Sequence, residues 1–169
     1  AMVCALTVGK KKYADVQELA IESQKKGNEL KAQFVDVMDR DTEAFNAVSA
    51  VFAMPKDTDE EKAARKAAMQ EALKGCTKTP FEMMELAYQA LELTRSVVGK
   101  LNASAASDLG CAALSLKAAI QGAWLNVLIN IGGIQDQAFA DEYRQKGQAL
   151  LDKALPLADA IYQEVLESL

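Results

Sequence analysis

The chain of 169 residues is long enough to fold as one domain around a single core. Its net charge of −5 argues against a nucleic-acid binder, because such proteins gather positive charge on one face. The three cysteines, Cys4, Cys76 and Cys111, have unrelated spacings and there is no histidine, so neither a zinc site nor a disulfide framework is indicated and a cytoplasmic location fits best.

Half of the residues are hydrophobic, only 6% are aromatic and no segment has the pattern of a strand, which predicts an all-α fold. The first element is expected to be the end of a helix that begins before residue 1 and stops at Gly9. Lys10, Lys11 and Lys12 follow, where positive charge complements the carboxyl end of a helix. They are either a solvated charge run or a place where one or two lysines bind an anionic ligand.

A long helix is predicted over about residues 14–53, with a kink near the string DRDTE and an end before Pro55. Its apolar positions recur at helical spacing: Leu30, Phe34, Val37, Met38, Phe45, Val48 and Phe52. Asp41 interrupts this stripe. It either caps a new helix after a break, or is a buried carboxylate of raised pKa that acts as general acid or base, or pairs with Arg40 or a lysine.

Two further helix starts carry a threonine three residues before a glutamate, a pattern typical of a capping box. The first is Thr58 with Glu61. The second is Thr79 with Glu82, with Pro80 at the favoured first helical position. These signals predict helices over 58–75 and 80–99.

A turn at GKLNAS follows, and Ser107 is expected to cap a helix that runs to about residue 133. A last helix is expected from about Asp136 to Leu169, kinked at Pro156. The chain shows no repeats or linkers. The sequence therefore predicts a single domain, residues 1–169, built as an up-and-down bundle of about five long helices plus the remnant at the N-terminus.

The helix over 107–133 is apolar almost all the way round, yet Lys117, Gln121 and two asparagines make a membrane a poor environment for it. Small and polar residues share one of its faces: Asp108, Ser115, Ala119, Gly122, Asn126, Asn130 and Gly133. This face either lets another helix approach closely, with the asparagines bonding across the interface, or lines a ligand crevice. So apolar a helix also predicts self-association, most simply as a homodimer.

Several strings resemble the cyclodeaminase domain of formiminotransferase-cyclodeaminase, a domain that also occurs as stand-alone bacterial proteins, including methenyltetrahydrofolate cyclohydrolases. They are LTVGKKKY, DRDTEAFNAVSAVFAMPKDTDEEKAARKAAMQEALK, the TP at 79–80 and NASAASDLGCAALSLKAAIQGAWLNVLINIGGIQD, so the resemblance covers nearly the whole chain. The family's first helix and its glycine-rich PGGGS segment would precede Ala1 and are absent from this sequence.

The resemblance implies an all-α dimer that acts on a one-carbon folate, without a metal or redox cofactor. The first function it implies is cyclisation of 5-formiminotetrahydrofolate to 5,10-methenyltetrahydrofolate with release of ammonia, with a formiminotransferase as a potential partner. The alternative is hydrolysis of the methenyl compound to 10-formyltetrahydrofolate. A non-catalytic helical binding or scaffold protein is a third interpretation.

Because the chain has no histidine, proton transfer in either reaction would fall to other groups. On the positions that match the family, we expect Asp41 to be the proton-transfer carboxylate. Asp108, as a second catalytic group, is expected to hold the pterin or the reacting carbon together with Asn126 and Asn130. Lys10 or Lys11 is expected to bind the glutamate carboxylates of the folate.

Overall fold

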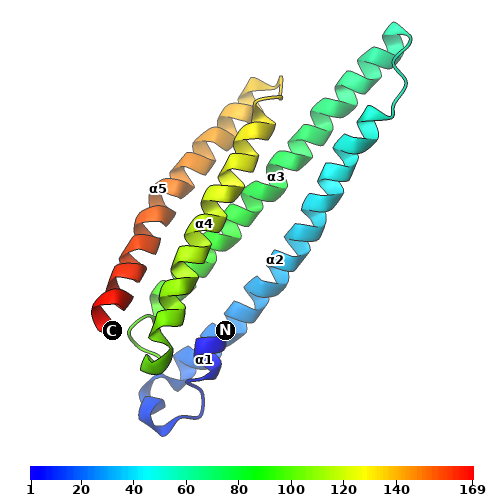
Figure 1. Cartoon of the computed structure of the whole chain (residues 1–169). Coiled ribbons are helices and arrows are strands. Elements are labelled where there is room, and N and C mark those ends of the chain that lie inside the picture. Colours follow the sequence, from blue (N-terminus) through cyan, green and yellow to red (C-terminus); the bar gives the residue numbers. More distant parts are fainter.

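The computed structural model describes all of residues 1–169 and contains helices and no strands. The five α-helices are α1 (Met2–Ala5), α2 (Gln17–Phe52), α3 (Asp59–Val97), α4 (Ala106–Ile131) and α5 (Gln137–Ser168). Short 3₁₀ turns at Lys11–Val16 and Ala103–Ala105 precede α2 and α4. The four long helices alternate in direction (Figure 1), so the predicted all-α up-and-down bundle is confirmed.

The helices do not share contacts equally. α3, α4 and α5 pack against one another around a shared core, whereas α2 lies along α3 and makes no extended contact with α4 or α5. The largest fully buried side chains include Met84 and Leu91 of α3, Ile120 of α4 and Ile161 of α5. The far end of the α2–α3 hairpin extends beyond the end of the α4–α5 pair (Figure 1). Both α2 and α4 therefore pack against α3.

The local signals at two helix starts are confirmed. Thr58 and Glu61 form the complete capping box at the start of α3. The Asp136 side chain accepts the Phe139 N–H at 3.1 Å and so caps α5. Gly9 has the positive φ expected of it, 76°, but it lies beyond the helix end: α1 stops at Ala5 and turns connect it to Gly9.

Three predicted helix boundaries are wrong. α2 runs without a break through residues 39–43, so Asp41 caps no new helix. α3 continues through Pro80 and joins the two helices predicted over 58–75 and 80–99. Ser107 lies within the first turn of α4, which follows a 3₁₀ turn that Asn102 caps. Pro156 lies inside α5, which runs from Gln137 to Ser168 as the predicted last helix does.

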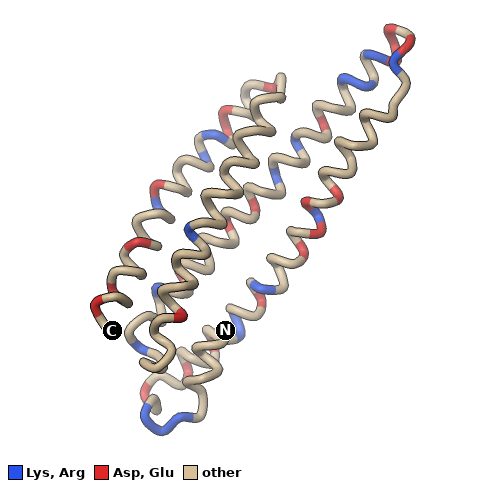
Figure 2. Tube along the Cα trace, viewed as in Figure 1, with Lys and Arg blue, Asp and Glu red and all other residues tan.

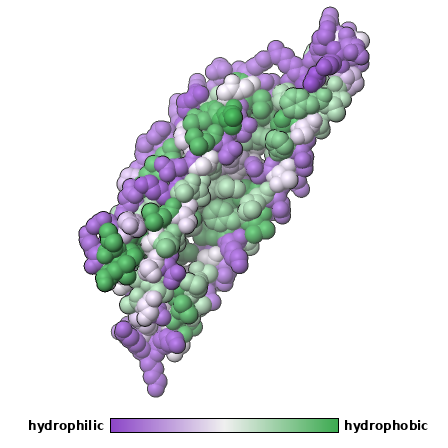
Figure 3. Space-filling view, in the orientation of Figure 1, coloured by the Kyte–Doolittle hydropathy of each residue, from purple (hydrophilic) through white to green (hydrophobic).

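The apolar stripe predicted for α2 divides into two faces. Leu30 and Val37 are buried against α3, whereas Met38, Phe45 and Phe52 are 59–65% exposed. Hydrophobic side chains are also gathered in a hollowed part of the surface between α4 and α2 (Figure 3). The single chain thus leaves an apolar groove over α3, which we call the α2–α4 groove.

α4 is the one helix long and apolar enough by composition to cross a membrane. Its Lys117 forms an ion pair at 2.6 Å with Asp159 of α5, and its inner face packs on α3 and α5. Charged and amide groups along a span of this length are costly in lipid. The contacts of α4 are therefore those of a helix within the bundle and not those of a membrane span.

Candidate active site

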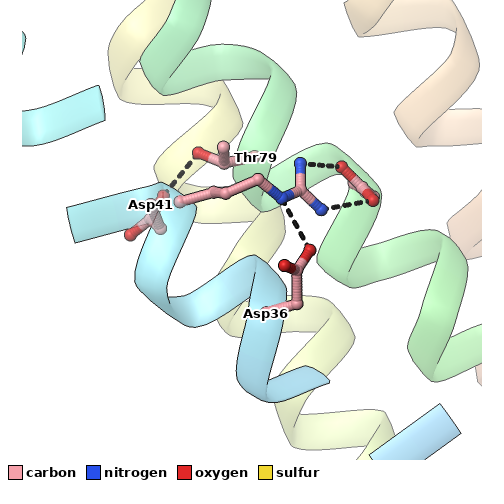
Figure 4. A network of polar contacts seen from close by, with 5 residues as sticks. Asp36, Asp41 and Thr79 are labelled. Atoms are coloured by element: carbon pink, nitrogen blue, oxygen red, sulfur yellow. Dashed lines mark hydrogen bonds and ion pairs between the residues drawn. The ribbon is translucent and has the colours of Figure 1, made fainter. Parts of the chain in front are cut away.

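Asp41 bonds to a threonine of the neighbouring helix. The Thr79 hydroxyl of α3 donates to the Asp41 carboxylate Oδ1 at 2.6 Å (Figure 4). The buried threonines Thr77 and Thr94 instead donate to carbonyls of their own helix. Asp41 is half-buried, and its second oxygen, Oδ2, has no hydrogen-bond partner within the chain. One oxygen is therefore held in place while the other is unpartnered.

The preceding residue on α2, Arg40, pairs with carboxylates other than Asp41. Its guanidinium donates two hydrogen bonds to Glu82 of α3, at 2.6 and 2.8 Å, and a third to Asp36 at 2.8 Å (Figure 4). The hydrogen bonds to Glu82 and then Asp36 raise the pKa of Arg40 further above its usual value. Arg40 is thus fixed as a cation, and the predicted ion pair between Arg40 and Asp41 is wrong.

Asn130 completes the polar contacts around this part of α3. Its side-chain amide donates to the Cys76 carbonyl at 2.7 Å and to the Asn126 carbonyl of its own helix at 2.8 Å. Asn126 lies one turn earlier on the same side of α4, is exposed, and donates to the Gly122 carbonyl at 3.1 Å. α4 therefore contacts the α3 turn that also contacts Asp41.

The Cys76 thiol lies close enough to Asp41 to respond to its charge. Burial, and secondarily the negative charge of Asp41, raises the pKa of this thiol. A buried thiol of raised pKa stays protonated at neutral pH and is a weak nucleophile. The chemistry of this cluster therefore rests on the Asp41 carboxylate.

Asp41, Cys76, Thr79 and Asn130, which we call the α3-turn cluster, connect α2, α3 and α4 beneath the α2–α4 groove. A half-buried carboxylate beside apolar side chains suits a flat, largely apolar ligand that exchanges protons with it. The structure contains no group of three or more histidine, cysteine or acidic residues that could hold a metal ion.

Asp108 is not part of this cluster. It is exposed in the first turn of α4 and lines a pocket of about 300 Å³ with Thr94, Cys111 and Ser115. At about 1.5 Å per residue, Asp108 lies roughly 33 Å from Asn130 along α4. The expectation that Asp108, Asn126 and Asn130 hold one ligand together is wrong within a single chain, because residues on one face of a long helix can lie far apart along its axis.

Lys10 and Lys11 are also remote from Asp41. Both are exposed, at and just before the 3₁₀ turn that precedes α2, and the segment there carries positive charge at one end of the bundle (Figure 2). From Gln17, where α2 begins, to Asp41 the helix alone spans roughly 36 Å. Within one chain, a ligand against Asp41 is out of reach of either lysine.

The sequence analysis missed Thr79 and Glu82 as partners of α2. Both were assigned to a capping box at a helix start, yet the structure uses them for hydrogen bonds to Asp41 and Arg40. Arg40 and Asp41 are neighbours on α2, and their partners on α3 lie three positions apart, about one helical turn. Residues with this spacing on two packed helices can form two contacts side by side. The same spacing fits both uses, so the local pattern did not separate them.

The comparisons with known proteins agree on one family. The sequence profile of the formiminotransferase-cyclodeaminase family matches residues 1–149. A methenyltetrahydrofolate cyclohydrolase from Methylorubrum extorquens is 40% identical over 98% of this chain and 79% of the relative. The formimidoyltransferase-cyclodeaminase of Sus scrofa is 30% identical over 91% of this chain, which spans 28% of that longer protein.

A solved structure supports the same relationship. The crystal structure of formiminotetrahydrofolate cyclodeaminase from Thermotoga maritima superposes with a TM-score of 0.77 at 26% sequence identity. The match covers 99% of this chain and 78% of that one. Sequence and fold are therefore shared over nearly the full length described here.

Proposed function

Because the chain belongs to the formiminotransferase-cyclodeaminase family, we propose that it is an enzyme of one-carbon folate chemistry with its active site at the α3-turn cluster. We propose methenyltetrahydrofolate cyclohydrolase as its first activity. The observation that carries this choice is the 40% identity to a relative of that name over 98% of the chain. Cyclodeaminase activity is the second candidate, favoured by the name of the structural relative.

In the cyclohydrolase reaction, Asp41 would act first as a base. As a water oxygen bonds to the methenyl carbon, Asp41 Oδ2 accepts one proton from that water. Asp41 then returns the proton to N5 as the bond between N5 and the carbon breaks. The remaining hydroxyl proton is lost to solvent as the carbonyl of 10-formyltetrahydrofolate forms.

In the cyclodeaminase reaction, the same oxygen would move a proton between two nitrogens. The formimino group reacts in its protonated, amidinium form: N10 attacks its carbon, Asp41 accepts the N10 proton and passes it to the leaving nitrogen. That nitrogen then carries three hydrogens and departs as ammonia as the methenyl cation forms. Neither route needs a metal or a redox cofactor. This second reaction does need a source of 5-formiminotetrahydrofolate, a role that a formiminotransferase would fill.

The two activities are separated by assaying one preparation with both substrates. We expect the absorbance of 5,10-methenyltetrahydrofolate to decay faster with enzyme than without it, with 10-formyltetrahydrofolate as product. Formation of methenyl absorbance together with ammonia from 5-formiminotetrahydrofolate would establish the cyclodeaminase instead. Inactivity toward both substrates, in protein shown to be folded, would contradict the proposed function.

We also propose that the protein is a cytoplasmic homodimer. One face of α4 carries exposed residues three or four positions apart, the spacing of a helix-pairing seam: Ser107, Cys111, Leu114, Ala118, Gln121, Leu125 and Ile129. Leu125 and Ile129 are 66% and 76% exposed, and Tyr162 and Leu166 of α5 add exposed apolar surface. A second copy of this chain is the simplest cover for such a surface.

Light scattering after size-exclusion chromatography tests the dimer. We expect twice the mass of 18.2 kDa, and a shift to the monomer mass when Leu125 and Ile129 are both replaced by glutamate. The matched control is Leu169→Glu, at an exposed apolar position at the end of the chain, which should remain dimeric. A monomeric parent protein at micromolar concentration would contradict the proposal.

A further inference from the structure

Pro80 leaves one backbone carbonyl of α3 without its helical partner. In a regular α-helix the N–H of residue 80 would donate to the carbonyl of residue 76, but proline has no N–H. A proline ring inside a helix also crowds that carbonyl. Pro80 and Cys76 are both buried, so water is a poor substitute for the lost donor.

The side chain of Asn130 takes the place of the missing N–H. Its Nδ2 donates to the Cys76 carbonyl at 2.7 Å, a good length for an N–H···O hydrogen bond. The same amide donates its second hydrogen to the Asn126 carbonyl, which fixes the orientation of the side chain. The asparagine of α4 thus donates to the carbonyl that the proline of α3 leaves without a helical partner.

This contact lies next to the residue that holds the proposed catalytic carboxylate. Thr79 precedes Pro80 directly, and its hydroxyl donates to Asp41 Oδ1 at 2.6 Å instead of to its own helix. The position of Thr79 therefore depends on the local geometry of the turn from Cys76 to Pro80.

We propose that Asn130 is a positioning residue: by replacing the N–H that Pro80 lacks, it fixes the α3 turn that presents Thr79 to Asp41. The structural half of this proposal is independent of the reaction, whereas the effect on turnover rests on the proposed function. Asn130 then acts through α3, not as the direct substrate ligand expected from the sequence. Its hydrogen bond to the Cys76 carbonyl supplies the donor that α3 lacks at Pro80.

A double-mutant cycle between Asn130→Ala and Pro80→Ala tests the structural half. Asn130→Ala alone leaves the Cys76 carbonyl without a donor and should lower the midpoint of thermal unfolding by roughly 3–8 °C. In the Pro80→Ala background the residue 80 N–H can bond to that carbonyl. There the same substitution should cost less than about half as much.

Asn126→Ala is the matched control, because the Asn126 amide donates only to a carbonyl of its own helix. Its effect on the midpoint should be the same in the parent protein and in the Pro80→Ala background. Equal losses for Asn130→Ala in the two backgrounds would overturn the proposal.

Turnover tests the positioning half at a temperature where every variant is folded. Asn130→Ala should lower kcat about tenfold or more with KM changed less than about threefold, since it displaces a reacting group and not the binding surface. Adding Pro80→Ala should restore most of the lost kcat. One outcome separates the two halves: Asn130→Ala and Pro80→Ala interact in the unfolding midpoints, Asp41→Asn is inactive, but Asn130→Ala leaves kcat unchanged. In that case the positioning role is overturned and the proposed function stands. If Asp41→Asn is fully active, the proposed catalytic role has failed while the stability cycle still decides the structural contact.

Discussion

Replacing Asp41 with asparagine is expected to lower kcat by about 10²- to 10⁴-fold, the usual contribution of a positioned general acid or base. Asparagine keeps the shape of the side chain, and its carbonyl oxygen can still accept the hydrogen bond from Thr79. The variant loses the negative charge and, with it, the ability to exchange a proton. The measurement is the initial rate of methenyl loss, and of ammonia release, under saturating substrate.

Asp39→Asn is the matched control for this variant. Asp39 is exposed on α2, close to Asp41 in the sequence, and its side chain forms none of the ion pairs described above. The substitution changes the net charge by the same amount and should leave kcat within about twofold, as usual for a surface change away from the reacting groups. If Asp41→Asn retains more than half of the parent kcat with both substrates, Asp41 is not the proton-transfer group.

Replacing Gly147 with alanine is expected to destabilise the protein by about 1–3 kcal/mol, although alanine is the better helix former. Gly147 is buried in α5, where a Cβ atom would lie 2.0 Å from Cζ3 of the Trp124 ring on α4. The indole would have to leave its place between the two helices. The midpoint of thermal unfolding should fall by about 2–10 °C.

Gly75→Ala supplies the opposite case at another helical glycine. A Cβ there would meet only the Cβ of Ala44, at an ordinary contact distance of 3.9 Å. This variant should therefore gain up to about 1 kcal/mol from helix propensity and reduced freedom of the unfolded chain. An equal or higher midpoint for Gly147→Ala than for the parent protein would contradict the packing described here.

Helix type and several helix ends were predictable from the sequence because they depend on local chemistry. The Thr58 capping box and the Asp136 cap are made entirely by neighbouring residues. The positive φ of Gly9 likewise follows from the residue itself. Such features need no knowledge of the tertiary fold.

The helix boundary predicted at Pro80 failed because its true environment comes from other helices. The donor that lets α3 continue is the Asn130 side chain of α4, far away in the sequence. Thr79 and Glu82 are likewise engaged by α2 and not by a helix start. At Pro80 a tertiary contact satisfies the freed carbonyl, and no local pattern reports that contact.

The candidate site was predictable in part. Asp41 was singled out because it interrupts an apolar stripe, and it does lie half-buried against α3. Asp108 and Asn126 were grouped by helical phase alone, which ignores separation along the axis, and the structure places them toward opposite ends of α4. The close contact of Gly147 with Trp124 went unnoticed, since it depends on how α4 and α5 cross.

The most direct test of the account is a crystal structure of the protein with a non-reacting analogue of 5,10-methenyltetrahydrofolate. We expect the analogue to lie in the α2–α4 groove with its one-carbon position within about 3.2 Å of Asp41 Oδ2, directly or through one water. An analogue bound instead in the pocket lined by Asp108, or in the groove of about 440 Å³ between α3 and α5, without contact to Asp41, would contradict it.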